Sequence, residues 1–565
     1  MKIKKSRSAA IVRWTGLMLV AWGLLFPGRT MAAGTWTALS SSAPSFVQLM
    51  LLLADGTVMA QNVGGNAWYR LSPDIHGSYV NGSWTTLASM HNTRQFYSSA
   101  VLRDGRVFVA GAEYGTGSNT AEVYDPVGNT WTLTPVSGQN FIDSISKILP
   151  DGRVLIAPVQ PNSPGITVIY DPFLNIWSNG GTLVRGGEQQ DEASWVKLPD
   201  DSILTIDPDT SNCERYIPSL NQWVNDASVR VAMYDILPGY VGEIGAAFLL
   251  PNGRAFFLGG TGHTAIYTPS GNSSPGTWVA GPDIPNGQVA ADAAGAMMVN
   301  GKILCVTSAA LFVNGSGNVV FPTPASFYEY DYSVGSIGSF TQVSGPTGAT
   351  DNVQPFIPLM LDLPDGTVLY SHYGSDLYVY APDGSPLAAG KPTINSITAN
   401  GNGSFHLTGT GLNGISEGAA YGDDAQMNSN YPLVRVTDGS GNVYYLPTFN
   451  WSSTGVRTGN NPVSTEFFAF TGLAAGASYS LVAVANGIAS DPVTFYGPVW
   501  VDFNSGDPTQ IGSFDFPYHT LAQGISAVPT GGTISIKTAG HSPELMTISK
   551  PMSIVAFGGL VTLGQ

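Results

Sequence analysis

Residues 96–131 read FYSSAVLRDGRVFVAGAEYGTGSNTAEVYDPVGNTW. Apolar and polar residues alternate on both sides of Asp104-Gly105, and Gly128-Asn129 marks a second turn. An Asp-Gly pair between two alternating runs is a strong hairpin signal, because Gly accepts the left-handed backbone of a tight turn. The stretch predicts three strands, the third ending in Tyr-Asp-Pro, and a short fourth strand that carries Trp131. One such unit makes a four-stranded sheet.

The same unit recurs, with variation, between residues 47 and 382. Its hairpin turn is filled in order by Asp55-Gly56, Asp104-Gly105, Asp151-Gly152, Asp200-Asp201, Asn252-Gly253, Asn300-Gly301 and Asp365-Gly366. Successive turns lie 49, 47, 49, 52, 48 and 65 residues apart. A period near fifty residues is typical of kelch-type propeller blades, so seven turns predict a seven-bladed β-propeller.

An aromatic residue near the end of each unit supports this count. It is found at Trp84, Trp131, Trp177, Trp223, Trp278 and Phe340. The seventh unit ends at Tyr380-Ala381-Pro382 without one, whereas Trp36 lies in a lone predicted strand before the first unit. If this first strand joins the last unit, the ring closes and no sheet edge stays unpaired.

The whole chain has 565 residues, of which 11% are charged, with 68 Gly and 38 Pro. This composition suits turn-rich all-β structure in more than one domain. We predict a signal peptide at 1–33, a seven-bladed kelch propeller at 34–388, an immunoglobulin-like β-sandwich at 389–496, and a short segment like the start of a parallel β-helix at 497–565. The last segment has room for only one or two coils, so we expect it to be truncated, vestigial or completed by another chain.

The first 33 residues have the pattern of an export signal. Five basic residues precede an apolar run at 14–26, and the small residues Ala32-Ala33 follow it. The run is short for a membrane span and no later stretch reaches its length, so we expect no span in the mature chain. The predicted location is secreted, periplasmic or at the cell surface, with an uncleaved anchor as the alternative.

Charge narrows the range of partners. Removing residues 1–33 takes away six Lys or Arg and no acid, so the net charge moves from −16 to −22. Such an acidic protein is a poor binder of nucleic acid or anionic lipid, but it suits cations, neutral sugars or basic partners. Cys213 and Cys305 fall in the fourth and sixth units, which are not neighbours in a ring, so we expect two reduced cysteines.

Three short motifs, LTGTGL at 407–412, YGDDAQ at 421–426 and NYP at 430–432, suggest a family. With them, residues 35–496 resemble galactose oxidase and glyoxal oxidase, the copper-radical oxidases. GEIG at 242–245, GTGH at 260–263 and FNWSSTG at 449–455 are similar to bacterial exported kelch-repeat proteins, from which no activity carries over.

The resemblance implies copper ligands eight or nine residues before the hairpin turns: a Cys crosslinked to a Tyr from two early units, and a Tyr-His pair from the last. This chain has Val47, Phe96 and Phe356-Ile357 at these positions, and Thr454-Gly455 where the family has a further His. Copper needs imidazole or thiolate ligands in such a site. We therefore expect no copper and no radical chemistry.

Acids occupy the same position in the other units. Asp143, Glu192 and Asp292 lie eight residues before their turns, Glu243 lies nine before, and Asp191 adds a further acid. Equivalent positions of a propeller converge on the mouth of its central channel. We expect an acidic arc there, opposite an apolar sector formed by Val47, Phe96 and Phe356.

Other side chains join this candidate site. Arg94 is placed to pair with the axial acids, Tyr97 and Trp195 could stack a sugar, and His263 could face the same mouth. The predicted ligand-binding residues are Asp143, Asp191, Glu192, Glu243, Asp292, Arg94, Tyr97 and His263, and no catalytic residue is assigned.

The acids allow several interpretations. They could bind a hard cation such as Ca²⁺, orient the hydroxyls of a sugar, act as a glycosidase pair, or merely cap turns. We expect an exported, non-catalytic propeller that binds carbohydrate or another surface ligand. The alternatives are a divergent oxidase or hydrolase, and a structural or adhesive surface protein whose C-terminal segment joins a protein partner.

Overall fold

The computed structural model describes residues 34–159, 165–185, 190–237, 240, 242–418, 430–470 and 472–564. The expected signal peptide at 1–33 and the YGDDAQ motif lie outside these ranges. Strands dominate the described residues, and the one α-helix among them is α1 (Leu521–Ala527). No helix in this part of the chain is long and apolar enough to cross a membrane.

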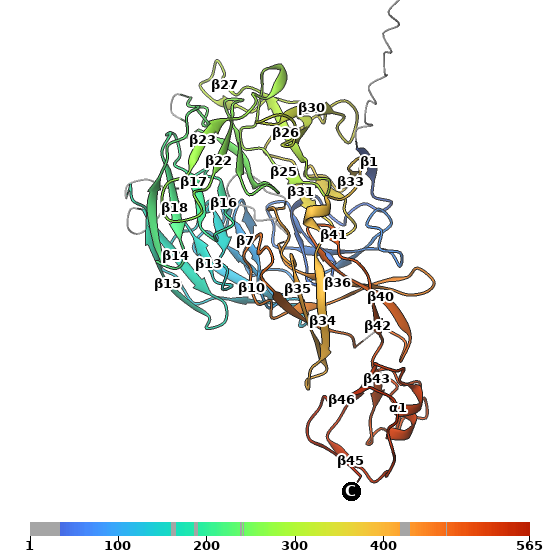
Figure 1. The fold of residues 1–565 in the computed structure, drawn as a ribbon. Coiled ribbons are helices and arrows are strands. Elements are labelled where there is room, and N and C mark those ends of the chain that lie inside the picture. The colour runs from blue at the N-terminus through green and yellow to red at the C-terminus, as the bar shows by residue number, and fades with distance from the viewer. Residues whose placement is uncertain are drawn as a thin grey trace, which may run out of the picture.

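Seven antiparallel sheets fill the repeat region (Figure 1). The first contains β2 (Val47–Leu52), β3 (Val58–Asn62), β4 (Trp68–Ser72) and β5 (Ser83–Thr86). The second contains β7 (Ser98–Val101), β8 (Val107–Ala110), β10 (Ala121–Asp125) and β11 (Thr130–Leu133). The third contains β12 (Ser146–Ile148), β13 (Val154–Ile156), β14 (Ile166–Asp171) and β15 (Ile176–Thr182).

The next four sheets repeat this order. The fourth contains β16 (Trp195–Lys197), β17 (Ile203–Ile206), β18 (Cys213–Ile217) and β19 (Gln222–Asp226). The fifth contains β20 (Ile244–Leu249), β21 (Ala255–Gly259), β22 (Thr264–Thr268) and β23 (Thr277–Ala280). The sixth contains β24 (Gln288–Val289), β25 (Gly295–Met297), β26 (Ile303–Ala309), β29 (Ser326–Asp331) and β30 (Ser339–Val343). The seventh contains β31 (Leu359–Asp362), β32 (Val368–Ser371), β33 (Tyr378–Ala381) and β1 (Thr35–Ala38).

Each predicted turn pair connects two strands of one sheet, as the sequence indicated. Gly105 has a φ of 85°, and its N–H donates to the Leu102 carbonyl over 2.8 Å. In the fourth sheet Asp201 takes the same left-handed backbone, with a φ of 66°, which is strained for a residue with a Cβ. The hairpin geometry is therefore kept even where Gly is absent.

The first strand of the chain closes the seventh sheet. β1 pairs antiparallel with β33, so that Thr35 lies opposite Ala381 and Trp36 opposite Tyr380. The Trp36 ring packs on Tyr380 with the ring centroids 4.8 Å apart. Trp131 packs on Tyr124 in the same way at 5.1 Å. Trp36 thus supplies the aromatic residue that the seventh unit lacks.

One strand of each sheet, namely β2, β7, β12, β16, β20, β25 and β31, is called its inner strand, and these strands lie side by side. β2 contacts β31, β31 contacts β25, β20 contacts β16, and β12 contacts both β16 and β7. All six residues of β2 and of β20 are buried. Cys213 and Cys305 are also buried and unbridged, as predicted. Two short ladders lie beside the main sheets, β6 (Arg94–Gln95) with β9 (Tyr114–Gly115) and β27 (Phe312–Val313) with β28 (Val319–Val320).

Two further antiparallel sheets follow and share one core, which contains Phe405, Leu407, Val434 and Leu481. We call them the two-sheet region. One sheet contains β34 (Thr393–Ala399), β35 (Ser404–Thr410), β39 (Val463–Phe468) and β38 (Thr448–Phe449). The other contains β37 (Val443–Leu446), β36 (Leu433–Thr437), β40 (Ser478–Ala485), β41 (Ile488–Ala489) and β42 (Val493–Tyr496).

The C-terminal segment pairs its strands in parallel, and in Figure 1 it extends beyond the two-sheet region. Its strands are β43 (Val499–Val501), β44 (Thr533–Ile536) and β46 (Ser553–Ala556) in one sheet, and β45 (Gly540–Ser542) with β47 (Val561–Leu563) in another. Thr520 caps α1 in a capping box with Gln523, and Leu521 of the helix is buried. Parallel pairing is what a β-helix-like segment requires.

The two-sheet region meets the inner strands at their hairpin-turn ends. The backbone N–H groups of Thr448, Trp451 and Thr454 donate to the carbonyls of Ala54, Arg103 and Pro150 over 3.1–3.2 Å. Two buried lysines lie at the same junction. Lys147 pairs with Glu417 at 3.0 Å, and Lys197 Nζ donates to the Thr454 carbonyl over 2.7 Å.

This junction predicts a pH-dependent stability. Burial lowers the pKa of Lys197 from 10.5 to about 8, although Glu417 opposes the change. Between pH 8 and 10 the unfolded chain therefore holds more protons at this residue than the folded chain, so raising the pH favours folding. Urea unfolding should show the stability of the wild type rising across this window by up to about 1.4 kcal/mol per pH unit relative to Lys197→Met. If the free energy of unfolding changes with pH equally in the wild type and in Lys197→Met, Lys197 is not the source of the pH dependence.

Candidate functional site

A pocket of about 420 Å³ lies where five inner strands begin. We call it the acidic pocket, and it is lined by Gln95, Phe96, Glu113, Tyr114, Asp143, Glu192, Tyr240, Glu243, Asp292, Phe321 and Phe356. Phe96, Asp143, Glu192, Glu243 and Asp292 stand one to three residues before β7, β12, β16, β20 and β25. The two-sheet region meets the opposite ends of these strands, so the pocket and that region lie at opposite ends of the inner strands.

The repeat places these residues through a common backbone kink. Phe96, Asp143, Glu192 and Asp292 all have positive φ, at 51°, 47°, 57° and 48°. Residues with a Cβ rarely adopt this region, so its return at one position of four units shows that the units share a local geometry. A backbone hydrogen bond between neighbouring units supports this geometry: the Asp292 N–H donates to the Ile244 carbonyl over 3.2 Å. The eight-residue spacing counted in the sequence therefore located residues that do converge.

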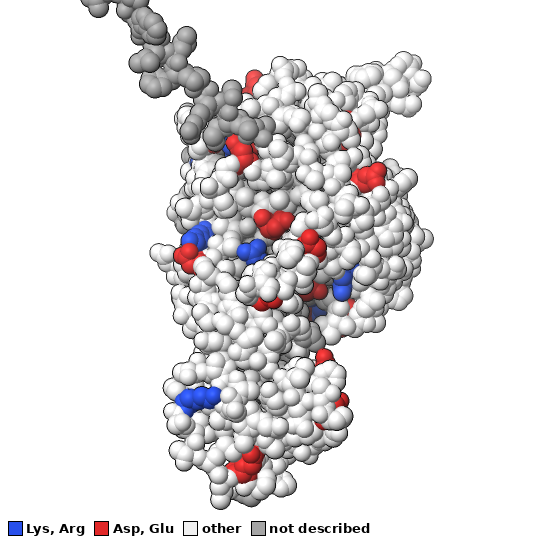
Figure 2. Space-filling view, turned by 90° about the vertical axis from the view of Figure 1, so that its right-hand side faces the viewer, with Lys and Arg blue, Asp and Glu red and all other residues white. Residues whose placement is uncertain are grey.

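The carboxylates of the pocket form two overlapping groups. Glu192, Glu243 and Asp292 each offer an oxygen within 4.8 Å of the others, and so do Asp143, Asp191 and Glu192. Figure 2 shows that charged side chains are sparse on the face in view, and only 11% of all residues are charged. Asp143, Glu192, Glu243 and Asp292 line the pocket together with Glu113, and Asp191 lies beside them without lining it, so negative charge is strongly concentrated here.

Burial and mutual repulsion raise the pKa values of two of these acids, Glu243 and Asp191. Glu243 is only 5% exposed, and burial followed by the charge of Asp292 raises its pKa well above the usual range. Burial and the charge of Asp209 raise the pKa of Asp191 as well. The Tyr240 hydroxyl donates to Glu243 Oε1, and the Glu243 N–H donates to Asp235 over 2.8 Å, which fixes the carboxylate in place. Such a site attracts a cation or a hydrogen-bond donor.

Aromatic rings form the other part of the pocket wall. Phe321 and Phe356 meet edge to face with centroids 5.0 Å apart, and Tyr240 contacts Phe321 at 6.3 Å. Phe96 contacts Tyr114 at 6.3 Å. Phe96 and Phe356 thus lie in the predicted apolar sector. Val47 does not, because it is fully buried within β2.

Five lining residues were not found from the sequence, and one of them is Gln95 of the short strand β6. Glu113, Tyr114, Tyr240 and Phe321 come from loops and from the short strand β9, outside the repeated positions. Burial raises the pKa of Glu113, and the charge of Asp191 adds to this. β9 pairs with β6 so that Tyr114 lies opposite Gln95, but a two-residue ladder leaves no periodic signal in a sequence.

Tyr97 and Trp195 are not available to stack a sugar, which corrects our expectation. Each is only 2% exposed. The Tyr97 hydroxyl donates to Gln61 Oε1 over 2.6 Å, and the Trp195 indole N–H donates to Gln190 Oε1 over 3.0 Å. Both rings belong to the hydrophobic core and not to the pocket wall.

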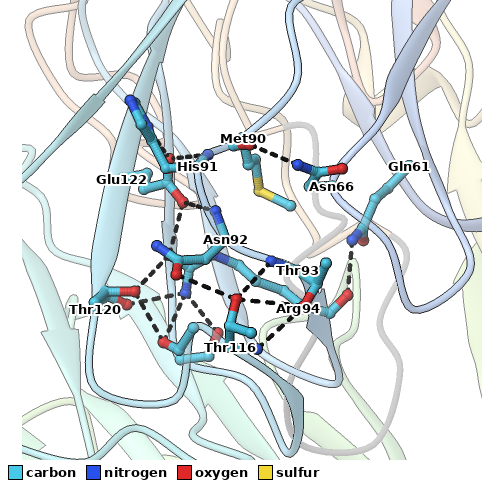
Figure 3. A network of polar contacts seen from close by, with 12 residues as sticks. Gln61, Asn66, Met90, His91, Asn92, Thr93, Arg94, Thr116, Thr120 and Glu122 are labelled. Carbon is cyan, nitrogen blue, oxygen red and sulfur yellow. Dashed lines mark hydrogen bonds and ion pairs between the residues drawn. The ribbon is translucent and has the colours of Figure 1, made fainter.

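Arg94 forms its ion pair with Glu122 and not with the axial acids, so this prediction was wrong. Its side chain is fully buried, and Figure 3 shows it within a network around Thr116, Thr120 and Glu122. The guanidinium pairs with Glu122 Oε1 at 2.9 Å and donates to the carbonyls of Gly111, Gly117 and Thr120. Arg94 therefore ties the loop before β7 to its own sheet.

His263 lies outside the pocket wall. It stands in the loop between β21 and β22, where its Nδ1 lies 2.8 Å from Asp283 Oδ1. The His263 side chain is 46% exposed and that of Asp283 is 72% exposed. This is a surface contact between two loops, since Asp283 follows β23.

Comparison with known proteins identifies the fold. No protein-family model and no curated protein matches the chain. Among solved structures, the chain is similar to a fungal alcohol oxidase of the AA5 family in complex with copper, with a TM-score of 0.52 and 15% identity over 82% of this chain and 99% of that one. The chain has a propeller-like fold. At this identity the likeness shows the fold alone.

Two other similar structures are more distant. They are YjhT, with a TM-score of 0.36 and 14% identity over 54% of this chain and 99% of that one, and virginiamycin B lyase from Staphylococcus aureus, with a TM-score of 0.39 and 10% identity over 62% and 98%. At these TM-scores neither carries an argument about this chain.

The pocket does not fit the copper that the alcohol oxidase holds. Its lining residues provide carboxylates, two tyrosines and three phenylalanines, and neither His nor Cys is among them. Thr454, expected at the position of the family's further His, is buried at the opposite ends of the strands, where its hydroxyl donates to the Leu149 carbonyl. Copper prefers imidazole and thiolate ligands, so these residues support no step of a radical mechanism.

Proposed function

We propose that this chain is an exported, non-catalytic kelch propeller that binds carbohydrate or another surface ligand in the acidic pocket. The observation that carries the proposal is the joint lining of one 420 Å³ pocket by carboxylates and aromatic rings. Carboxylates accept hydrogen bonds from hydroxyl or ammonium groups, and aromatic faces pack against the apolar side of a ligand. Such convergence of polar and aromatic groups is typical of a binding site.

The proposal includes a finer architecture. The seven sheets of residues 34–388 would be the blades of one ring, closed by the pairing of β1 with β33. The two-sheet region at 389–496 would be an immunoglobulin-like sandwich, which its shared core supports. Residues 497–565 would be the opening of a β-helix, which the parallel pairing of β43, β44 and β46 supports. Residues 1–33 would direct export to the periplasm, the medium or the cell surface.

Removing an acid from the pocket should weaken ligand binding. We expect Asp292→Ala and Glu192→Ala each to weaken ligand binding at least about tenfold, because a hydrogen bond to a charged group contributes about 1.5–3 kcal/mol. A glycan array, followed by calorimetry on each hit, measures this. Asp283→Ala is the matched control, since Asp283 is an exposed acid paired with His263 outside the pocket. Binding that is equal in all variants, or absent for every glycan and cell-surface extract, would contradict the proposal.

A second candidate function is a divergent hydrolase. Its support is the raised pKa of Glu243 beside the charge of Asp292, since unequal carboxyl pairs supply an acid and a base in glycosidases. Release of reducing ends from the glycans that bind, lost in Glu243→Gln, would favour this function. Peroxide release from alcohols or aldehydes would instead favour the oxidase alternative.

A further inference from the structure

Three carboxylates of the acidic pocket are spaced to share one ion. Glu192, Glu243 and Asp292 each present an oxygen, and the three atoms lie within 4.8 Å of one another. Ca²⁺ takes oxygen ligands at about 2.3–2.6 Å, so two ligands of one ion are at most about 5 Å apart. The three side chains come from the starts of three successive inner strands, and each is therefore held by a different sheet.

Glu243 gives an independent indication of a ligand. It lines the pocket although only 5% of it is exposed. Tyr240 donates to Oε1, whereas Oε2 is buried, and among the described residues it has no hydrogen-bonding neighbour other than the acid Glu192. A buried carboxylate oxygen without a donor is costly. Its carboxylate neighbours Glu192 and Asp292 offer no positive charge, so a cation between the three groups removes this cost.

The donor set selects a hard cation. The lining residues contribute carboxylate, hydroxyl and amide groups, and no Lys, Arg, His or Cys is among them. Zn²⁺ and Cu²⁺ favour nitrogen and sulfur ligands, whereas Ca²⁺ and Mg²⁺ favour oxygen. Mg²⁺ demands a near-ideal octahedron, but Ca²⁺ accepts six to eight oxygens in irregular arrangement. Three carboxylates from three sheets, with about 420 Å³ of space for further oxygens, suit Ca²⁺ better.

We propose that Glu192, Glu243 and Asp292 bind a Ca²⁺ ion in the acidic pocket. Glu243 Oε2 is the innermost ligand, because it is the most buried of the three carboxylates and Tyr240 holds its other oxygen. The remaining positions of the ion are filled by water or by hydroxyl groups of the ligand. The last point rests on the proposed function, whereas metal binding depends on the three carboxylates alone.

Titration with CaCl₂ alone tests the proposal. The full chain is first treated with a chelator, and calcium binding is then measured by calorimetry and by the shift in melting temperature. The wild type should bind one Ca²⁺ saturably and melt at a higher temperature with it. Glu243→Gln and Asp292→Asn should each weaken calcium binding at least tenfold, and Asp283→Asn should leave it unchanged. Without calcium, Glu243→Gln should melt no lower than the wild type, because Gln removes a buried charge while keeping the shape.

Two results would overturn the proposal: no saturable binding by the wild type at millimolar Ca²⁺, or binding of equal strength in Glu243→Gln and Asp292→Asn. Glycan binding measured with and without chelator separates this proposal from the proposed function. Calcium binding with no glycan bound supports the ion site and refutes the glycan. If the protein binds no calcium and still binds a glycan after treatment with the chelator, the proposed function is supported and the calcium site is refuted.

Discussion

Replacing Arg94 by Met should lower the free energy of unfolding by about 3–5 kcal/mol, because the change leaves a buried charge without its partner. Arg94 and Glu122 both have fully buried side chains, and their charged atoms lie 2.9 Å apart. Burial raises the pKa of Glu122, but the His91 N–H and the Arg94 guanidinium outweigh it and hold the pKa below its usual value. Without Arg94 the carboxylate loses its main positive neighbour, and the carbonyls of Gly111, Gly117 and Thr120 lose a donor.

Urea unfolding of four proteins measures this effect: the wild type, Arg94→Met, Glu122→Met and the double variant. We expect the double variant to lose less than the sum of the single losses, because removing both charges leaves neither one buried alone. Additive losses, or a loss below about 1 kcal/mol for Arg94→Met, would show that the ion pair contributes little. Ligand binding by any variant that stays folded should be unchanged, since Arg94 does not line the pocket.

A comparable loss is expected for Glu417→Gln at the junction with the two-sheet region. Glu417 is 1% exposed and pairs with Lys147, which is 4% exposed, at 3.0 Å. Its second oxygen accepts the Lys197 N–H over 3.4 Å. Gln removes the negative charge that pairs with the buried Lys147 ammonium and that also raises the pKa of Lys197, so we expect a cost of about 3–5 kcal/mol. Denaturant unfolding followed by Trp fluorescence checks the value.

The exposed pair of Lys391 and Asp491 is a matched control for this prediction. Their side chains are 42% and 84% exposed, so water already screens the contact. Asp491→Asn should therefore cost less than about 1 kcal/mol. If Glu417→Gln and Asp491→Asn have equal effects, the buried pair at the junction does not hold the two regions together.

The repeat made the fold and part of the site predictable. Six units have an Asp-Gly or Asn-Gly turn and the fourth has Asp200-Asp201, so counting residues back from the turns identified equivalent places in space without a structure. Asp143, Glu192 and Asp292 were found in this way, and all three line the acidic pocket. A period in the sequence becomes a position in space because each unit repeats the same local geometry.

The remaining site residues depend on contacts that have no period. Tyr240 and Phe321 lie in loops whose lengths differ from unit to unit, so counting from a turn cannot place them. Arg94 was misassigned because its partner Glu122 lies 28 residues away in β10, and nothing near Arg94 in the sequence indicates this pairing. Tyr97 was misassigned because its neighbour Phe96 lines the pocket whereas its own ring is buried in the core, where its hydroxyl donates to Gln61.

The pairing of β1 with β33 also sets an order of events during synthesis. Thr35 is among the first described residues to leave the ribosome, yet its partner Ala381 is made 346 residues later. At about 5–20 residues per second, the interval is roughly 20–70 s. During that time the segment carrying Trp36 stays without its sheet, and the last sheet cannot be completed. Of the strands in the described residues, β1 is made first, and it is therefore among the last to become stable.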